Sequence, residues 1–244
     1  MRRPLFTGLL LLTCLCMPLR GSAQAQSSSY SVSVRELRIP PKALRAFEQG
    51  QQRLAKNDAA GSLPHFQAAV SEYPGYYEAY DRIGAANLQL WHIVEAERAF
   101  RKSIEVSGAG YARPLLALGA ILDDQKNFAE AASVIRKGLD LAPDTATGYY
   151  YLGRALFGLN QLEEAESNAR EALRRKAEFP SAHLLLADIH GKKKEYESLV
   201  ADLDDYLRLA PDGPASAWAR NVRAAVERMI VESQSASAFA DPQF

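Results

Sequence analysis

The chain has 244 residues, enough for one or two ordinary domains, with 48% hydrophobic and 24% charged residues. This is the composition of a folded globular protein, and it excludes a chain that is disordered throughout. The 29 basic and 29 acidic residues cancel, so the composition lacks the basic excess that binding to nucleic acid requires.

The first residues have the pattern of a secretory signal peptide. Arg2 and Arg3 give a positive start, and the apolar run from 5 to 17 is too short to span a bilayer as a helix. Residues 23–25, Ala-Gln-Ala, then provide the small side chains that a signal peptidase accepts. We predict that the chain is cleaved after Ala25 and exported to the periplasm or secreted.

Cleavage would change the chemistry of the mature chain. It would remove both cysteines, Cys14 and Cys16, and with them any disulfide, thiol nucleophile or cysteine metal site. It would also leave 26 basic groups against 29 acidic ones, a net charge of −3. The alternatives are an uncleaved membrane anchor and a lipid anchor at Cys14, although Thr13 stands where a lipidation motif usually has a smaller residue.

A pattern of small residues recurs along the rest of the chain. Gly84, Gly119 and Gly153 each follow a Leu or Ile, and a large apolar residue lies three positions before that Leu or Ile. The three glycines are spaced 35 and 34 residues apart. The same spacing places Ala187 after them and Gly50 before them. Five units of about 34 residues therefore follow one another.

Each unit has a second apolar stretch after a polar turn. Its small or apolar residues lie 12, 16 and 19 positions beyond the small residue. In the five units these are Ser62, Phe66 and Ala69; Ala96, Phe100 and Ser103; Ala131, Ile135 and Gly138; Ala165, Ala169 and Ala172; and Leu199, Leu203 and Tyr206. Spacings of three and four mark one face of a helix, so each unit is predicted to be a hairpin of two helices. Pro74, Pro143 and Pro211 close three of the units.

This order of residues resembles the tetratricopeptide repeat, and the resemblance covers residues 42–211. It implies an all-α fold, a right-handed solenoid of about five helical hairpins in which each hairpin shields the next. The departures lie in the terminal repeats. Ala46 stands where a large residue is usual, and Leu199 and Tyr206 stand where alanine is preferred. Terminal repeats are often atypical because one side faces solvent or a cap.

The segments around the repeats are assigned separately. Residues 26–41 are expected to be a linker, and residues 232–244, small and polar, a disordered tail. Residues 212–231 are expected to form a capping helix. Its apolar residues recur at helical spacing, at Trp218, Val222, Val226 and Met229. Pro64 falls inside the second helix of the first unit, for which we expect a late start near Gly61 or Ser62, or a distorted first turn.

The sequence offers little sign of catalysis or metal binding. His183 and His190 lie seven positions apart on one predicted helix, near Asp188, whereas metal ligands usually lie three or four apart and include a third ligand. A phosphate-binding loop, a nucleophile elbow and a zinc motif are all missing. We expect no enzyme activity, no cofactor and no metal. A small-ligand or metal carrier that uses these three residues is the alternative.

The resemblance also implies a binding surface, because the first helices of successive tetratricopeptide units line a concave groove. Aromatic residues and arginine are favoured at binding hot spots, and acidic groups beside them can orient a basic partner. By register, the residues turned towards the groove are Phe47, Gln51, Leu54, Glu78, Asp81, Leu88, Arg113, Leu116, Asp123, Tyr150, Arg154, Phe157, Leu184, Asp188 and Lys192. The Lys-Asn-Lys-Arg arrangement of relatives that capture a free C-terminal carboxylate is not present.

We therefore predict an exported scaffold or adaptor that holds a protein or peptide in this groove. Nucleic acid is not an expected partner, and no membrane span is expected after signal cleavage. The runner-up is a lipid-anchored, pilotin-like or outer-membrane assembly accessory protein, which differs in how it is tethered. The sequence leaves the identity of the partner and the oligomeric state open.

Overall fold

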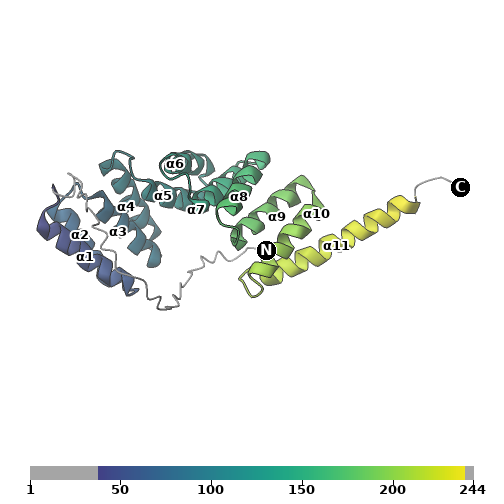
Figure 1. Cartoon of the computed structure of the whole chain (residues 1–244), viewed down its shortest axis with the longest axis horizontal. Helices are drawn as coiled ribbons and strands as arrows, with labels where there is room; N and C mark the ends of the chain where they lie inside the picture. Colours follow the sequence, from purple (N-terminus) through teal and green to yellow (C-terminus); the bar gives the residue numbers. More distant parts are fainter. Residues whose placement is uncertain (1–37, 240–244) are drawn as a thin grey trace, which may run out of the picture. The chain divides into compact units, whose positions relative to one another are not determined.

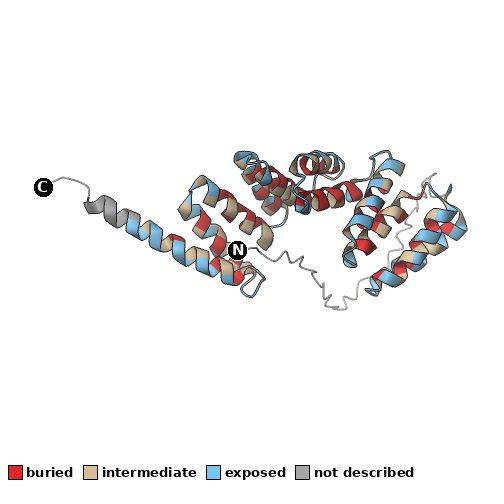
Figure 2. Cartoon of the chain, turned by 180° about the vertical axis from the view of Figure 1, so that it is seen from behind, coloured by how far each residue is buried: buried red, intermediate tan, exposed pale blue. Residues whose placement is uncertain are grey.

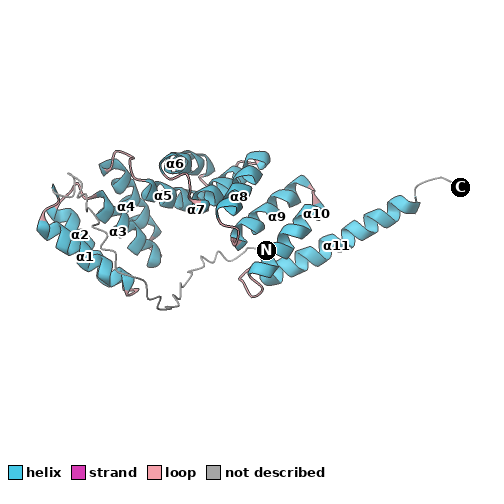
Figure 3. Cartoon of the chain, viewed as in Figure 1, coloured by secondary structure: helices cyan, strands magenta, loops and turns pink. Residues whose placement is uncertain are grey.

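The structure, a computed structural model, describes residues 38–239, and the side chains of residues 38–232. These residues form eleven α-helices, and no strand occurs among them (Figure 3). The predicted signal peptide, nearly all of the predicted linker and residues 240–244 lie outside the described residues. Within residues 38–239, no helix is both long and apolar enough to cross a membrane.

Ten of the helices pair into five consecutive hairpins (Figure 1). The first helices of the hairpins are α1 (Pro41–Ala55), α3 (Tyr77–Gln89), α5 (Ala112–Asp124), α7 (Ala146–Gly158) and α9 (Pro180–Lys193). The second helices are α2 (Ala59–Glu72), α4 (Ile93–Val106), α6 (Phe128–Leu141), α8 (Leu162–Arg175) and α10 (Tyr196–Leu209). The predicted all-α array of five hairpins is confirmed.

The small residue of each first helix lies where the second helix of the same hairpin crosses it. Three glycines face a large side chain sixteen positions later, in the pairs Gly50 with Phe66, Gly84 with Phe100 and Gly119 with Ile135. A Cβ on Gly84 would lie 2.6 Å from the nearest ring carbon of Phe100. In the fourth hairpin a Cβ on Gly153 would lie 3.1 Å from the Ala165 carbonyl oxygen. The recurring glycine is therefore a steric requirement of the crossing.

The turn inside each hairpin ends the first helix in the same way. Its central residue has a left-handed backbone with φ between 60° and 64°, at Asn57, Trp91, Lys126, Asn160 and Lys194. The next amide then donates back five residues, as from His92 N to Asn87 O at 2.9 Å, which is the Schellman arrangement. Asparagine tolerates this backbone well, whereas Trp91 is unusual there. Its side chain is 69% exposed.

The first helices lie on the inner side of the array. Each one contacts the first helix of the next hairpin, α1 with α3 through to α7 with α9. Across the described helices, no two second helices of neighbouring hairpins contact each other. Helices on the inside of a curved stack lie closer together than those on the outside, so the face of the first helices is the inner one. This is the side on which the predicted binding residues lie.

The main apolar core joins the middle hairpins. It contains Leu118, Leu122, Ile135, Leu156 and Ile189, which α5, α6, α7 and α9 contribute, and all of them are at most 2% exposed. Figure 2 shows buried residues along the packed faces of the hairpins, while exposed residues predominate on the later part of α11 (Ser216–Phe239) up to residue 232. Each hairpin is thus stabilised by burial against its neighbours.

Helix α11 covers the end of the array and is longer than predicted. Its Ala219 and Val226 join a buried cluster with Leu203 and Tyr206 of α10, which fits the predicted cap. The helix continues to Phe239, into the segment from 232 onward that we expected to be a disordered tail. These residues are small and polar, but they include neither glycine nor proline, and the next helix breaker is Pro242.

Helix α2 also departs from expectation. It begins at Ala59, not near Ser62, because the Asp58 carboxylate caps it by accepting from the Gly61 amide at 2.8 Å. Pro64 lies inside the helix and is exposed. It removes one backbone hydrogen bond without ending the helix.

Candidate functional site

The candidate site is the inner face, which we define as the surface formed by the five first helices and the residues directly before them. The predicted residues lie on it. Three groups differ in exposure. Gln51, Arg113 and Lys192 are exposed; Asp81 and Asp123 are buried; and the half-buried residues are Phe47, Leu54, Glu78, Leu88, Leu116, Tyr150, Arg154, Phe157, Leu184 and Asp188. Most of this face is thus made of side chains that touch both the array and its surroundings.

Two of the predicted residues serve mainly as packing. The ring of Phe47 lies 4.7 Å from that of Tyr76 and 5.6 Å from that of Phe66, centroid to centroid. Leu116 fills the space that glycine leaves at Gly138 in α6 and at Gly148 in α7. These side chains hold neighbouring helices together, so they contribute little free surface to the inner face.

Two arginines reach back from one first helix to a buried carboxylate on the preceding one. The Arg113 guanidinium lies 3.3 Å from Asp81, and that of Arg154 lies 2.8 Å from Asp123 and 2.9 Å from Asp124. The Asp81 side chain is fully buried and that of Asp123 is 2% exposed. Among the described residues neither carboxylate receives a well-aligned hydrogen bond, so the opposite charge is their main compensation.

Burial shifts the ionisation of both carboxyl groups. It raises the pKa of Asp123 to about 6, against the opposing effect of Arg154, and the Asp124 charge raises it further. Burial also raises the pKa of Asp81, with Arg113 as the chief opposing charge. Both groups therefore ionise less readily than an exposed aspartate.

Aromatic rings surround Arg154 on the inner face. The ring of Tyr150 lies 5.2 Å from that of Tyr151 and 5.1 Å from that of Phe179. The Arg154 guanidinium carbon lies 5.9 Å and 5.7 Å from the centroids of the two tyrosine rings. We call Tyr150, Tyr151, Arg154 and Phe179 the aromatic–arginine cluster. Tyrosine and arginine in a half-buried setting are the residue types that dominate binding energies.

A second cation–ring contact lies beside this cluster. The Lys192 ammonium of α9 lies 4.4 Å from the centroid of the Phe157 ring of α7 and 3.4 Å from the Asn160 side-chain oxygen. Each first helix from α5 onward thus has one cationic side chain, Arg113, Arg154 or Lys192, that contacts the preceding first helix. The inner face of α5, α7 and α9 therefore combines aromatic surface with fixed positive charge.

Sequence reasoning missed three members of this surface. Asp124 and Tyr151 directly follow the predicted Asp123 and Tyr150. Their position next to predicted residues could have identified them from the sequence. Phe179 lies just before α9, outside the repeat positions used for the prediction. Its proximity to Tyr150 depends on how two hairpins pack.

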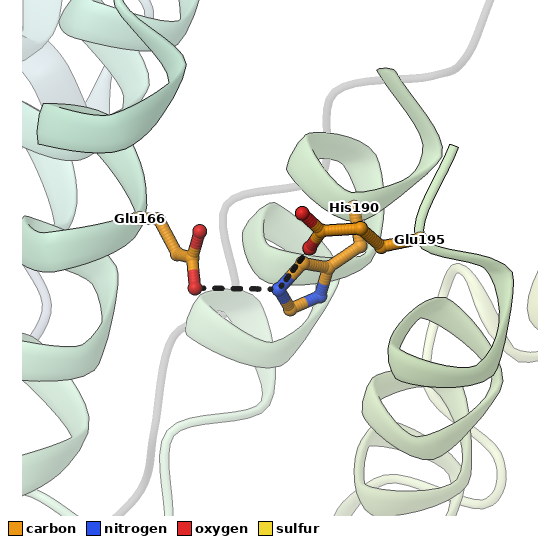
Figure 4. Close-up of side chains that lie close together, drawn as sticks. All are labelled: Glu166, His190 and Glu195. Carbon is orange, nitrogen blue, oxygen red and sulfur yellow. Dashed lines mark ion pairs between the residues drawn. The ribbon is translucent and has the colours of Figure 1, made fainter. Parts of the chain in front are cut away.

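His183 and His190 lie at a separate location, on α9 and next to α8 and α10. The His190 Nδ1 atom lies 2.6 Å from the Asp202 carboxylate. Its Nε2 atom lies 3.5 Å from Glu166 and 3.7 Å from Glu195 (Figure 4). His183 lies 3.8 Å from carboxylate oxygens of Asp202 and of Asp205. The carboxylates that contact His190 thus come from neighbouring helices and from the turn after α9.

Comparisons with known proteins agree with this architecture. The family model described as "Tetratricopeptide repeat" matches residues 116–167 and 150–214. The chain is 28% identical over 130 residues to the BBSome complex member BBS4 homolog of Drosophila melanogaster, a stretch that spans 53% of this chain and 26% of that relative. The match thus covers about a quarter of the relative's length.

Several solved structures share the fold. MamA residues 41–end from Desulfovibrio magneticus RS-1 superimposes with a TM-score of 0.64 at 21% identity, covering 72% of this chain and 99% of that one. PilW, a type IV pilus biogenesis factor, gives 0.65 at 16% identity, over 84% and 96% of the two chains. YrrB, a tetratricopeptide protein with an unusual peptide-binding site, gives 0.62 at 17% identity, over 73% and 92%.

The repeat pattern, the glycine crossings and the paired helices point to the same conclusion as these matches. Tetratricopeptide arrays are scaffolds for protein–protein interaction and are normally not catalytic. Residues 116–214 match the tetratricopeptide-repeat family, and the five hairpins share the fold of its solved members.

Proposed function

We propose that the chain is an exported adaptor or assembly factor, not an enzyme, and that its inner face binds a segment of a partner protein. The observation that carries this proposal is the aromatic–arginine cluster. It presents half-buried aromatic rings and an arginine side chain that is 26% exposed. It lies where α7 contacts α5 and the residue directly before α9.

The cluster suits binding because its side chains are already held in place. Arg154 is fixed by Asp123 and Asp124, and Tyr150 is fixed between Tyr151 and Phe179. Groups that are ordered before binding lose little conformational entropy when a partner arrives. A partner segment with an apolar side chain next to a charged one would match the rings and the charges together.

The structural neighbours support this proposal without identifying a partner. YrrB has a described peptide-binding site and PilW a described role in pilus biogenesis, and both share the fold at low identity. A role in holding a peptide or in helping an assembly is therefore compatible with the scaffold. Because fold and function are separable, the assignment for this chain depends on its own inner face.

Site-specific photo-crosslinking tests the inner face. A benzophenone amino acid would replace Gln51, Asp124 or Lys192 on first helices, or, as matched controls, the exposed Lys137 or Glu163 on second helices. We expect the three inner positions to yield adducts with a common partner in the producing cells, and the outer positions to yield few. Equal or stronger adducts from the outer positions would show that the partner binds elsewhere.

Export is a separate part of the proposal and has its own test. It is based on the pattern of residues 1–25, and mass spectrometry of the mature protein should find Gln26 at its N-terminus. An acylated Cys14 would replace this proposal by the runner-up, a lipid-anchored accessory protein of the pilotin or outer-membrane assembly kind. A mature chain that still begins at Met1 would overturn both versions.

A further inference from the structure

We propose that Glu166, His190 and Glu195 form a binding site for a divalent transition-metal ion of the zinc class. The site differs from the inner face and from the set His183, His190 and Asp188 that the sequence suggested. Its ligands come from α8, from α9 and from the residue directly before α10 (Figure 4), so a bound ion would connect the fourth and fifth hairpins.

The donor atoms are close to the geometry that a metal needs. The His190 Nε2 atom lies 3.5 Å from Glu166 Oε1 and 3.7 Å from Glu195 Oε2, and all three donor atoms lie within 4.8 Å of one another. Zinc binds nitrogen and oxygen at about 2.0–2.2 Å, so tetrahedral ligands lie roughly 3.3–3.6 Å apart. Small movements of two glutamate side chains would close the site.

The histidine is oriented as metal-binding histidines usually are. Its Nδ1 atom lies 2.6 Å from Asp202 Oδ2, and because an ionised carboxylate can only accept, Nδ1 carries the proton. The Nε2 atom then faces Glu166 and Glu195. A carboxylate behind a histidine that faces a metal is the common outer-shell arrangement. The His190 side chain is 3% exposed, so this orientation is fixed by packing.

Two carboxylate oxygens converge on the Nε2 atom of His190, and this set of three donor atoms can be bridged by a divalent cation. A metal ion would turn all three contacts into bonds. Glutamate and imidazole ligands without thiolate suit Zn²⁺, Mn²⁺, Fe²⁺, Co²⁺ or Ni²⁺ and not Cu⁺.

Neighbouring cations hold the two glutamates ionised and in place. The Lys193 ammonium lies 2.8 Å from Glu166 Oε2 and 3.0 Å from Glu195 Oε1, the two oxygens that do not face His190. Arg170 donates to Glu166 Oε1, the oxygen that faces His190, from Nη2 at 2.7 Å and from Nε at 3.0 Å. Ionised carboxylates are the form that binds metal. The same cations repel a metal ion, so removing Lys193 should strengthen binding.

The test uses the untagged full-length protein with Cys14 and Cys16 changed to serine, stripped with a chelator and titrated with Zn²⁺ and with Co²⁺. We expect Zn²⁺ to raise the melting temperature, because an ion that binds only the folded chain stabilises it. Co²⁺ should give the visible absorption of a low-coordinate nitrogen–oxygen site. E195Q should weaken binding at least tenfold, H190Q should abolish it, and K193Q should tighten it severalfold.

His183→Gln is the matched control, since His183 is a buried histidine on the same helix, and this variant should bind metal like the wild type. H190Q changes a buried side chain and could disturb folding. E195Q tests the site without this risk, because the Glu195 side chain is 43% exposed. The proposal is overturned if the wild type shows neither a thermal shift nor a cobalt spectrum at millimolar metal. Retention of wild-type affinity by H190Q or E195Q would overturn it as well.

Discussion

The buried carboxyl group of Asp123 should make the stability of this protein depend on pH in an unusual direction. Most paired carboxylates have a lowered pKa and stabilise a protein as pH rises. Asp123 has a pKa raised from 3.8 to about 6. Between these values the folded chain binds more protons than the unfolded chain. The contribution of Asp123 to the free energy of unfolding therefore falls as pH rises through this window.

The size of the effect follows from the shift. A difference of roughly 2 pKa units corresponds to about 3 kcal/mol between the limits of low and high pH. Between pH 4.5 and 7.5, where the chain can be studied folded, about 2 kcal/mol of this change should be visible. The side chain is 2% exposed, so solvent does not screen it strongly.

Asp123→Asn isolates this effect, because asparagine keeps the shape and does not titrate. The free energy of unfolding of the wild type and of the variant would be measured by urea denaturation, followed by circular dichroism, at half-unit steps of pH. We expect the wild-type value minus the variant value to fall by about 2 kcal/mol from pH 4.5 to 7.5.

Asp124→Asn is the control, since it removes an exposed partner of Arg154 and leaves the buried group intact. This variant should keep most of the fall seen in the wild type, slightly reduced because the Asp124 charge also raises the pKa of Asp123. A difference between wild type and Asp123→Asn that stays constant within about 0.5 kcal/mol, or that grows with pH, would show that burial does not govern this carboxyl group.

Three further predictions concern the scaffold. Gly119→Leu should lower the free energy of unfolding by about 1–3 kcal/mol, because its side chain would collide with Ile135; urea denaturation checks this, and an unchanged midpoint would contradict the crossing model. Trp91→Asn should stabilise the chain by about 0.5–1 kcal/mol, since a left-handed backbone costs a residue with a Cβ roughly 1–2 kcal/mol and asparagine less; a clear loss of stability on thermal melting would mean that the exposed ring makes unrecognised contacts. Deleting residues 216–244 should expose α10 and speed its amide hydrogen exchange, whereas deleting 233–244 should not; equal exchange in both deletions would argue against α11 as a cap.

The inner face was predictable in part. Repeat register placed Arg113, Asp123, Tyr150, Arg154 and Lys192 on first helices, because their positions relative to the glycines are fixed by helix periodicity alone. Register did not show that Asp123 would be buried, which requires the neighbouring hairpin to cover it. Register also placed Leu116 on the inner face as a binding residue. In the structure, this side chain fills the space beside Gly138 and Gly148.

The cluster around His190 shows the limit of local reasoning more sharply. The sequence suggests partners on the same helix, such as His183 and Asp188. The structure brings Glu166 from 24 positions before and Asp202 from 12 positions after. Such pairs meet only when two hairpins pack at a particular offset, and periodicity contains no information on that offset.

The sequence by itself determined the helices, their pairing into hairpins and the order of the array, because each crossing needs a small residue at a fixed position and leaves that requirement visible as a repeat. Tertiary structure alone decided which charges are buried and which side chains from different hairpins meet. Those properties depend on the packing between units, where the partners are far apart in the chain.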